Sequence, residues 1–260
     1  MSRYCILVPC YNEATRLPQA RFEAFAQNDP AFNVCFVNDG SSDNTLGVLK
    51  GLCNAHPATF RYIDLQPNRG KADAVRAAML QLHDEAQYEW LGFLDADLSV
   101  SLEQVGLFVD EIEAAPELRL VVGTRLRRLG AKIYRSPLRH YFSRLIATWI
   151  DGLILKIGVY DSQCGAKLFR RTDIPHLFER PFLSRWLFDI ELFARQIIAL
   201  GPTEMRRTSL EVPIKAYDDP GDSRISSTYV LKVPYELIRI GRRYRKALRR
   251  ARKQDAEAGE

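Results

Sequence analysis

Short apolar runs alternate with helix-like segments over the first half of the chain. The apolar runs have the length and composition of buried strands, and the segments between them carry capping residues or apolar side chains at helical spacing. The strand-like runs are residues 4–9, 32–40, 60–65, 88–98 and 118–125. The helix-like segments are residues 41–53, 71–86 and 101–115. This alternation predicts an α/β fold with a mostly parallel sheet that is flanked by helices on both faces.

The pattern changes after residue 130. Residues 136–158 and 185–200 are predicted to be amphipathic helices, residues 160–171 a strand or loop, and residues 206–216 a strand. A polar loop over residues 218–227 precedes a basic amphipathic helix that begins near Tyr229. The sequence has no internal repeat and no low-complexity linker. It therefore predicts one domain over residues 1–228, followed by a basic amphipathic C-terminal helix and tail over residues 229–260.

Polar side chains follow most of the predicted strands. In open parallel sheets, ligands bind at the carboxyl ends of the strands, so these side chains predict a site. They are Asn12 and Glu13, Asn38 and Asp39, Asp95 and Asp97, and Thr124 and Arg125.

Two of these residues, Asp95 and Asp97, end the apolar run in "FLDADLSV". Residues two apart in a strand point the same way, so both carboxylates can converge on one cation. Mg²⁺ and Mn²⁺ prefer oxygen ligands and often share them with substrate phosphates. The alternative is that this turn caps the helix that follows.

Three other features at the predicted strand ends suit a nucleotide. Asp39 precedes a glycine turn and can accept hydrogen bonds from a base or ribose, although an Asx turn is the alternative. Pro9 ends the first strand, and beyond it Tyr11 can stack on a base and Glu13 can bind a sugar or base. Lys71 stands beside a glycine at a helix start, where a phosphate binds readily, although a solvated loop explains the pattern equally well.

Together these motifs resemble family 2 glycosyltransferases with the GT-A fold, from Arg3 to about Ile225. The segments that carry the resemblance are "VPCYNEATRLP", "VNDGSSDNT", "NRGKADAVRAAM", "FLDADLS" and "VGTRL". Two later segments, "DSQCGAKLFRR" and "RWLFDIEL", resemble the branch that contains dolichyl-phosphate beta-glucosyltransferases and polyprenyl-phosphate mannosyltransferases.

The resemblance implies inverting transfer of a hexose from a nucleotide sugar to a polyprenyl or dolichyl phosphate. UDP-glucose is the first expected donor and GDP-mannose the second. The resemblance assigns the nucleotide to Pro9, Tyr11, Glu13, Asp39 and Lys71. It assigns Mg²⁺ or Mn²⁺ to Asp95 and Asp97, the donor phosphates to Arg125, and the acceptor pocket to Gln163.

A base is expected only for some acceptors. Transfer to a hydroxyl needs a carboxylate that takes the proton, whereas a phosphate acceptor is already anionic. "RWLFDIEL" places Asp189 and Glu191 where the family base often lies, and on a helix only one of them can face the cleft. We expect Asp189 to be that residue; the alternative is that it anchors Arg185 or another cation.

Composition adds a prediction about location. Of 260 residues, 47% are hydrophobic, and the five cysteines lack the paired spacing of metal sites, which favours free, buried thiols in a reducing compartment. The N-terminus does not resemble a signal peptide, and the apolar stretch over residues 145–159 is interrupted by Asp151 and Lys156. The predicted location is cytoplasmic.

Charge is concentrated near the C-terminus. Residues 239–253 hold nine Lys or Arg and no acidic residue. The positive charge of this segment is therefore larger than the net charge of the whole chain, which is +5. Apolar residues are interspersed, so the tail is predicted to hold the protein on an anionic membrane surface, in place of the N-terminal anchor of dolichyl-phosphate glucosyltransferases. A solvated tail is the alternative, and nucleic acid is not expected because no base-reading motif accompanies the charge. The apolar residues are Tyr235, Leu237, Ile238, Ile240 and Leu248.

Three other functions compete with the first. A glycosyltransferase that acts on the hydroxyl of a glycan or lipid-linked sugar is the nearest alternative. A sugar-1-phosphate nucleotidyltransferase would carry a glycine-rich basic loop after the first strand, where this chain has "CYNEATRLP". A non-catalytic nucleotide-sugar-binding protein is disfavoured because Asp95, Asp97 and Arg125 are all retained.

Overall fold

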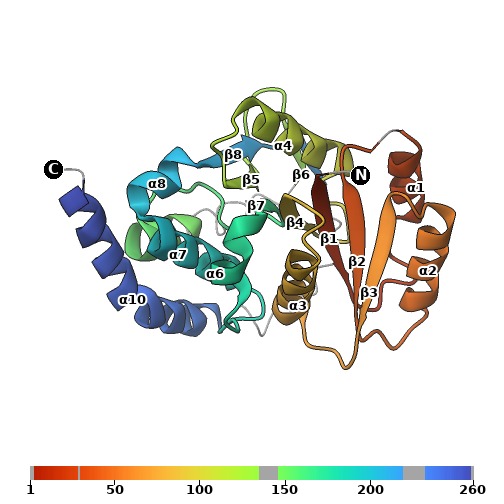
Figure 1. The fold of residues 1–260 in the computed structure, drawn as a ribbon, viewed down its shortest axis with the longest axis horizontal. Coiled ribbons are helices and arrows are strands. Elements are labelled where there is room, and N and C mark those ends of the chain that lie inside the picture. Colours follow the sequence, from red (N-terminus) through yellow and green to blue (C-terminus); the bar gives the residue numbers. More distant parts are fainter. Residues whose placement is uncertain (1–2, 29, 135–145, 219–231, 259–260) are drawn as a thin grey trace.

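A seven-stranded sheet organises the chain (Figure 1). The computed structural model describes residues 3–28, 30–134, 146–218 and 232–258. The strand order is β3-β2-β1-β4-β7-β5-β8. The strands are β1 (Tyr4–Cys10), β2 (Asn33–Asp39), β3 (Phe60–Leu65), β4 (Trp90–Leu94), β5 (Leu120–Thr124), β7 (Ala166–Arg170) and β8 (Ser209–Pro213).

The sheet is mixed and mostly parallel, as predicted. Within it, β7 alone runs antiparallel, between β4 and β5. Its first residues therefore lie at the edge where β4 and β5 end. A second, two-stranded sheet pairs β6 (Lys132–Tyr134) with β9 (Ala216–Asp218), and the apolar pattern did not predict it.

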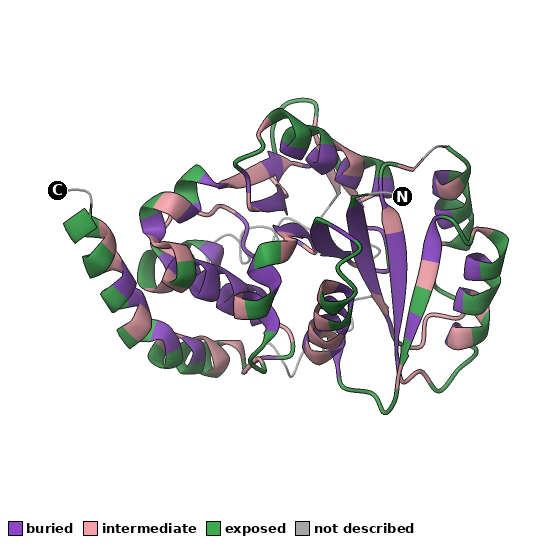
Figure 2. Ribbon diagram, in the orientation of Figure 1, coloured by how far each residue is buried: buried purple, intermediate pink, exposed green. Residues whose placement is uncertain are grey.

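Helices cover both faces of the sheet, which confirms the prediction (Figure 2). Alternate residues of β1 enter two separate cores, with Cys5 and Leu7 on one face and Ile6 and Val8 on the other. The face with Ile6 packs on α1 (Gln19–Gln27), α2 (Thr45–Ala55) and α4 (Leu102–Ala114). The face with Leu7 packs on α3 (Lys71–Asp84), α6 (Ile174–Phe178), α7 (Phe188–Leu200) and α8 (Pro202–Arg207). The last helix, α10 (Val233–Ala258), packs in turn on α7 and α8. A short 3-10 turn, η2 (Arg171–Asp173), leads into α6.

The long helix predicted over residues 136–158 differs from the structure. Residues 135–145 lie outside the described part, and the helix over residues 146–150 continues as a π-helical turn, η1 (Asp151–Leu155). It stops at Lys156, which has a φ of 56°. The Asp151 carboxylate accepts hydrogen bonds from the backbone N–H groups of Ile157 and Gly158, both at 3.1 Å, and so caps the helix end.

The basic C-terminal helix, α10, packs into the domain core. Its predicted start near Tyr229 and the predicted boundary at residue 228 lie outside the described residues. Ile240 and Leu248 are 0% and 1% exposed, so the prediction that they are available to a membrane is wrong for these two residues. Tyr244 donates a hydrogen bond of 3.0 Å to the buried Glu191 carboxylate of α7. The helix is amphipathic because one face closes the core.

All five cysteines are free and buried, as predicted. Among the described residues, no helix combines the length and the apolar character that crossing a bilayer requires.

Candidate active site

Two loops at the carboxyl ends of β1 and β2 are tied together. The backbone N–H of Asn12 donates to the Ser41 hydroxyl at 3.0 Å, and the N–H of Glu13 donates to the Thr45 hydroxyl at 2.7 Å. Asn12 also accepts a 2.8 Å hydrogen bond from the N–H of Ser42. The structure thus fixes the backbone around Pro9, Tyr11 and Glu13 at this edge; their contacts with a nucleotide stay predictions.

Asp39 organises the loop that leads into α3. Its buried carboxylate accepts hydrogen bonds from the Asn68 amide at 2.9 Å and from the backbone N–H groups of Arg69 and Gly70, both at 2.8 Å. A carboxylate has room for about four such bonds, so a ligand could still bind it. Gly70 has a φ of +84° and lies under the Arg185 guanidinium, which would meet an added Cβ at 2.4 Å. Because Asp39 holds Gly70 in place, it also sets the position of Lys71, which directly follows Gly70 in the chain.

Lys71 connects this loop to the pair of aspartates. Its ammonium forms an ion pair with the Asp95 carboxylate. Burial disfavours the charged lysine, but Asp95 and then Asp189 outweigh burial and raise the pKa of Lys71. Asp97 keeps part of its side chain open to solvent, yet the surrounding protein and then the Asp95 charge raise the pKa of its carboxyl. The site thus holds an excess of negative charge at the end of β4.

This charge suits a hard cation. Within the described residues, no group of three or more His, Cys, Asp or Glu side chains could hold a metal ion. Asp95 and Asp97 supply two carboxylates, and a metal there would take its remaining oxygens from water and substrate phosphates, which is the usual arrangement for Mg²⁺. The surrounding protein and then the Asp95 charge raise the pKa of Asp97, and a bound cation would offset the repulsion from Asp95. The two residues therefore fit a shared metal.

The start of β7 presses against Asp95. A Cβ added to Gly165 would lie 2.1 Å from the Asp95 Oδ2 atom, so only glycine leaves the carboxylate in place.

Gly165→Ala is expected to displace the Asp95 carboxylate while the backbone stays folded, because the clash is with the end of a side chain. A misplacement of about 1 Å at a reacting group can cost about a hundredfold in rate, and we expect a loss of that size in turnover. Gly106→Ala in α4 is the matched control, since a Cβ there meets nothing within 4 Å. Steady-state assays that show equal activity for both variants would contradict the placement of Asp95.

Arg125 is held rigidly by Asp161, a residue that the sequence analysis did not assign. Its Nε and Nη2 atoms lie 2.7 and 2.8 Å from the two carboxylate oxygens. Burial alone would raise the pKa of the Asp161 carboxyl, but the guanidinium outweighs it and lowers that pKa to about 2. The Glu211 carboxylate in turn accepts hydrogen bonds from the backbone N–H groups of Tyr160 and Asp161, at 2.8 and 2.9 Å. The contact of Arg125 with donor phosphates stays a prediction.

Two further predicted site residues are Gln163 and Asp189. The Gln163 backbone N–H donates to Asp161 at 3.3 Å, and its role at the acceptor stays a prediction. Asp189, at the start of α7, is 6% exposed and forms an ion pair with Lys167 of β7. Glu191 is fully buried, and its carboxylate accepts a hydrogen bond of 2.8 Å from the backbone N–H of Leu183. Its role is therefore structural. A lysine within the apolar run "AKLF" was the only sequence signal for Lys167.

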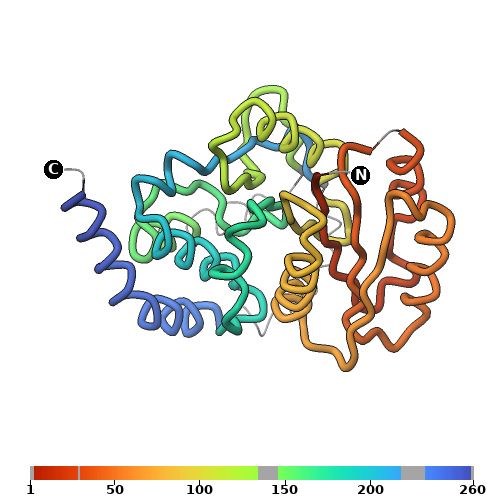
Figure 3. The backbone as a smooth tube through the Cα atoms, viewed as in Figure 1, coloured from red at the N-terminus to blue at the C-terminus, as the bar shows by residue number. Residues whose placement is uncertain are grey.

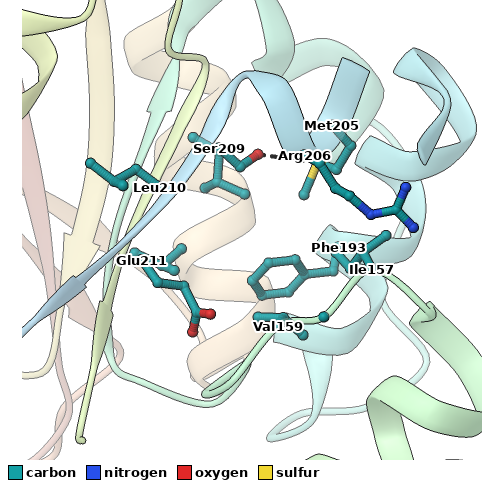
Figure 4. Close-up of a pocket in the computed structure, with 11 residues that line it drawn as sticks. Ile157, Val159, Phe193, Met205, Arg206, Ser209, Leu210 and Glu211 are labelled. Carbon is teal, nitrogen blue, oxygen red and sulfur yellow. Dashed lines mark hydrogen bonds between the residues drawn. The ribbon is translucent and has the colours of Figure 1, made fainter. Parts of the chain in front are cut away.

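A cavity of about 280 Å³ lies under the first halves of β5 and β8 and contains none of the predicted site residues (Figure 4). Its wall includes Ile157, Val159, Phe193 and Met205, with Glu211 at one side. In Figure 3 the green, cyan and blue parts of the chain, which are far apart in the sequence, lie together in the left half of the view. Glu211 lines the cavity and also accepts the backbone hydrogen bonds beside Asp161, so it connects the cavity to the loop that holds Arg125.

Comparison with known proteins identifies similar chains. The model of the Glycosyl transferase family 2 matches residues 5–178. A dolichyl-phosphate beta-glucosyltransferase of Trichomonas vaginalis is 31% identical over an alignment of 258 positions, and the match covers 93% of this chain and 72% of that protein. The Drosophila melanogaster dolichyl-phosphate beta-glucosyltransferase is 36% identical over an alignment of 205 positions, and the match covers 72% of this chain and 60% of that protein.

Solved structures share the fold at lower identity. The mannosyltransferase of Pyrobaculum calidifontis, in complex with GDP-Man and Mn²⁺, gives a TM-score of 0.60 at 20% identity over 92% of this chain and 62% of that chain. The glucosyl-3-phosphoglycerate synthase of Mycobacterium tuberculosis, in complex with Mn²⁺, UDP-glucose and phosphoglyceric acid, gives 0.61 at 14% identity over 96% and 79%. These similarities confirm the predicted GT-A fold.

Proposed function

The chain belongs to glycosyltransferase family 2, and from this premise we propose that it transfers glucose from UDP-glucose to a polyprenyl or dolichyl phosphate. The names of the relatives from T. vaginalis and D. melanogaster support the donor sugar and the acceptor. The observation that carries the proposal is the placement of Asp95, Asp97 and Lys71 together at the carboxyl edge of the sheet. GDP-mannose is the second candidate donor.

The residues of the site suit the departure of a nucleoside diphosphate. Asp95 and Asp97 would hold Mg²⁺ or Mn²⁺, which supplies positive charge to the donor diphosphate when it is bound. Lys71 and Arg125 would add fixed positive charge where negative charge develops as the sugar leaves. Pro9, Tyr11, Glu13 and Asp39 would bind the nucleoside, and Gln163 would face the acceptor.

A donor panel tests this function. UDP-glucose, GDP-mannose and UDP-galactose are each incubated with Mn²⁺, with and without citronellyl phosphate, a short polyprenyl phosphate. Release of nucleoside diphosphate that depends on citronellyl phosphate and is fastest with UDP-glucose supports the proposal. Release that citronellyl phosphate does not change with any donor would count against it.

Exposed side chains near the start of α10 suit a membrane surface. Tyr235 and Ile238 are 63% and 53% exposed, and Trp149 and Leu153 are 59% and 75% exposed in and beside η1. The two elements lie against each other, because Arg252 of α10 donates hydrogen bonds to carbonyl groups of η1. Apolar side chains beside many cations are typical of proteins that bind anionic lipid at the bilayer surface, where a polyprenyl phosphate would be found.

Neutralising one exposed stripe of α10 is expected to weaken binding to anionic vesicles. Arg242, Lys246 and Arg249 are exposed and lie on one side of the helix. Each cation contributes about 1 kcal/mol near an anionic leaflet, so replacing the three with Gln should weaken partitioning by roughly a hundredfold. Sedimentation with vesicles of phosphatidylserine and phosphatidylcholine at low salt measures the change.

The matched control replaces three exposed cations elsewhere with Gln, namely Lys50, Arg128 and Lys132. It should bind nearly as well as the unaltered protein. Equal binding by both triple variants would contradict a membrane role for α10, while activity in solution should persist in both.

A further inference from the structure

The loop that precedes α7 brings an exposed arginine to the edge of the site. The Arg185 guanidinium covers Gly70 so closely that an added Cβ there would collide with its Nε and Nη2 atoms. Its Nη2 also donates a hydrogen bond of 3.5 Å to the Asn68 amide oxygen. Gly70 directly precedes Lys71, whose ammonium pairs with Asp95. Arg185 therefore lies one residue away from the Lys71–Asp95 pair.

Hydrogen bonds fix the backbone of this loop. The backbone N–H groups of Leu183 and Ser184 donate to the buried Glu191 carboxylate at 2.8 and 3.2 Å. The Ser184 hydroxyl accepts a hydrogen bond of 2.8 Å from the backbone N–H of Leu187. Arg185 thus combines a side chain that is open to solvent with a backbone that is held on both sides.

The same loop contacts the first turn of α10. The Ser184 hydroxyl donates a hydrogen bond to the Glu236 carboxylate of that turn. Glu236 lies between the exposed Tyr235 and Ile238, two of the side chains that we propose to meet a membrane surface. Figure 1 shows the segment between α6 and α7 in the space between α3 and the start of α10. Arg185 is therefore placed between the site and the proposed membrane surface.

A lipid phosphate acceptor has to connect these two places. Its chain stays in the bilayer, and one of its phosphate oxygens bonds to the anomeric carbon of the donor. The bond from that carbon to the donor diphosphate breaks, its electron pair leaves with the diphosphate, and no proton has to move. Two anions meet in this step, so a fixed cation beside the acceptor phosphate would lower their repulsion.

The exposed guanidinium is available for this task. Lys71 and Arg125 are each paired with an aspartate, namely Asp95 and Asp161. Within the part of the chain that the structure describes, Arg185 forms no ion pair with a carboxylate, and the Asn68 amide oxygen is its hydrogen-bond partner. A guanidinium presents several N–H donors in one plane, which matches the oxygens of a phosphate.

We propose that Arg185 binds the phosphate group of a lipid phosphate acceptor and so selects acceptors of this class at the membrane surface. This inference rests on the proposed function and assigns a residue to the recognition of its acceptor.

Arg185→Gln tests the inference, because it removes the charge and keeps a polar side chain. Loss of a hydrogen bond between charged groups costs roughly ten- to a hundredfold in affinity, so the KM for citronellyl phosphate should rise by at least about tenfold. The KM for UDP-glucose should change by less than about threefold, since other residues are proposed to hold the donor. Arg185→Lys keeps the charge but not the planar donors, and its KM for citronellyl phosphate should rise less.

Arg180→Gln is the matched control, since Arg180 is an exposed arginine of the same segment. Its two KM values should equal those of the unaltered protein. A purely structural Arg185 would act through Asn68, which also binds Asp39, and the donor KM would then rise together with the acceptor KM. That result, or an acceptor KM in Arg185→Gln equal to that of the control, overturns the inference. Should Arg185→Gln fail to fold, the two KM values of Arg185→Lys decide in the same way.

Titration calorimetry provides a readout that does not depend on turnover. The protein is loaded with UDP and Mn²⁺ and titrated with citronellyl phosphate or with inorganic phosphate. Citronellyl phosphate should bind the unaltered protein more tightly than inorganic phosphate does, and Arg185→Gln should weaken its binding by at least about tenfold. Equal affinity for the two ligands would show recognition of free phosphate and would overturn the assignment to a lipid.

The two proposals fail in different ways. An unaltered protein that does not use citronellyl phosphate with any donor removes the proposed function. An unaltered protein that does use it, with equal acceptor KM values in Arg185→Gln and Arg180→Gln, removes only the role of Arg185.

Discussion

Asp97→Ala is expected to lower glucosyl transfer by about a thousandfold, because a metal held at a diphosphate supplies several kcal/mol of charge stabilisation and each 1.36 kcal/mol is about tenfold in rate. The fold should persist. The surrounding protein and then the Asp95 charge raise the pKa of Asp97, so at neutral pH the ionised carboxylate is less favourable in the folded protein than in the unfolded chain. Removing the carboxylate therefore relieves repulsion at neutral pH and should not lower the melting temperature. Initial rates at limiting Mn²⁺ and thermal unfolding measure the two effects.

Asp110→Ala is the matched control, since Asp110 is an exposed aspartate of α4. Its turnover and its dependence on Mn²⁺ should match those of the unaltered protein. Turnover by Asp97→Ala that approaches the control at limiting Mn²⁺ would refute the assignment of Asp97 as a metal ligand.

Asp39→Ala is expected to lower both stability and donor affinity. The substitution removes the acceptor for the backbone N–H groups of Arg69 and Gly70, and an unsatisfied buried donor costs about 1–3 kcal/mol. A combined loss of about 3 kcal/mol corresponds to a fall in melting temperature of roughly 6–12 °C for a domain of this size. The donor KM should rise by more than kcat falls, since the loop positions groups that we propose to bind the nucleotide.

Asp84→Ala provides the comparison, because Asp84 is exposed at the end of α3. It should unfold at the same temperature as the unaltered protein. An Asp39→Ala protein with the stability of this control and an unchanged donor affinity by calorimetry would show that the carboxylate neither holds the loop nor serves the donor.

Much of the fold followed from local pattern. The near-continuous apolar runs of β1, β2 and β4 predicted strands that are buried on both faces, and the polar residues after them marked the edge where Asp39, Asp95 and Asp97 lie. These features depend on neighbours along the chain, which is why they are visible in the sequence.

Features that depend on distant partners were not predictable in this way. The pairing of Arg125 with Asp161 and of Lys167 with Asp189 joins residues that only the sheet order brings together. The apolar side of α10 has the same periodicity whether it meets a bilayer or a core, and Ile240 shows that it meets a core. Periodicity identifies an apolar face but not what covers that face.

The structure of the lipid product tests the central claim most directly. UDP-[¹³C]glucose is incubated with dolichyl phosphate, Mn²⁺ and the full chain, and the purified lipid is examined by ¹H and ³¹P NMR. The account predicts glucose joined through its anomeric carbon to the dolichyl phosphate in the β configuration, inverted relative to the donor. An α-linked product, or glucose attached to a hydroxyl with the dolichyl phosphate unchanged, would contradict it.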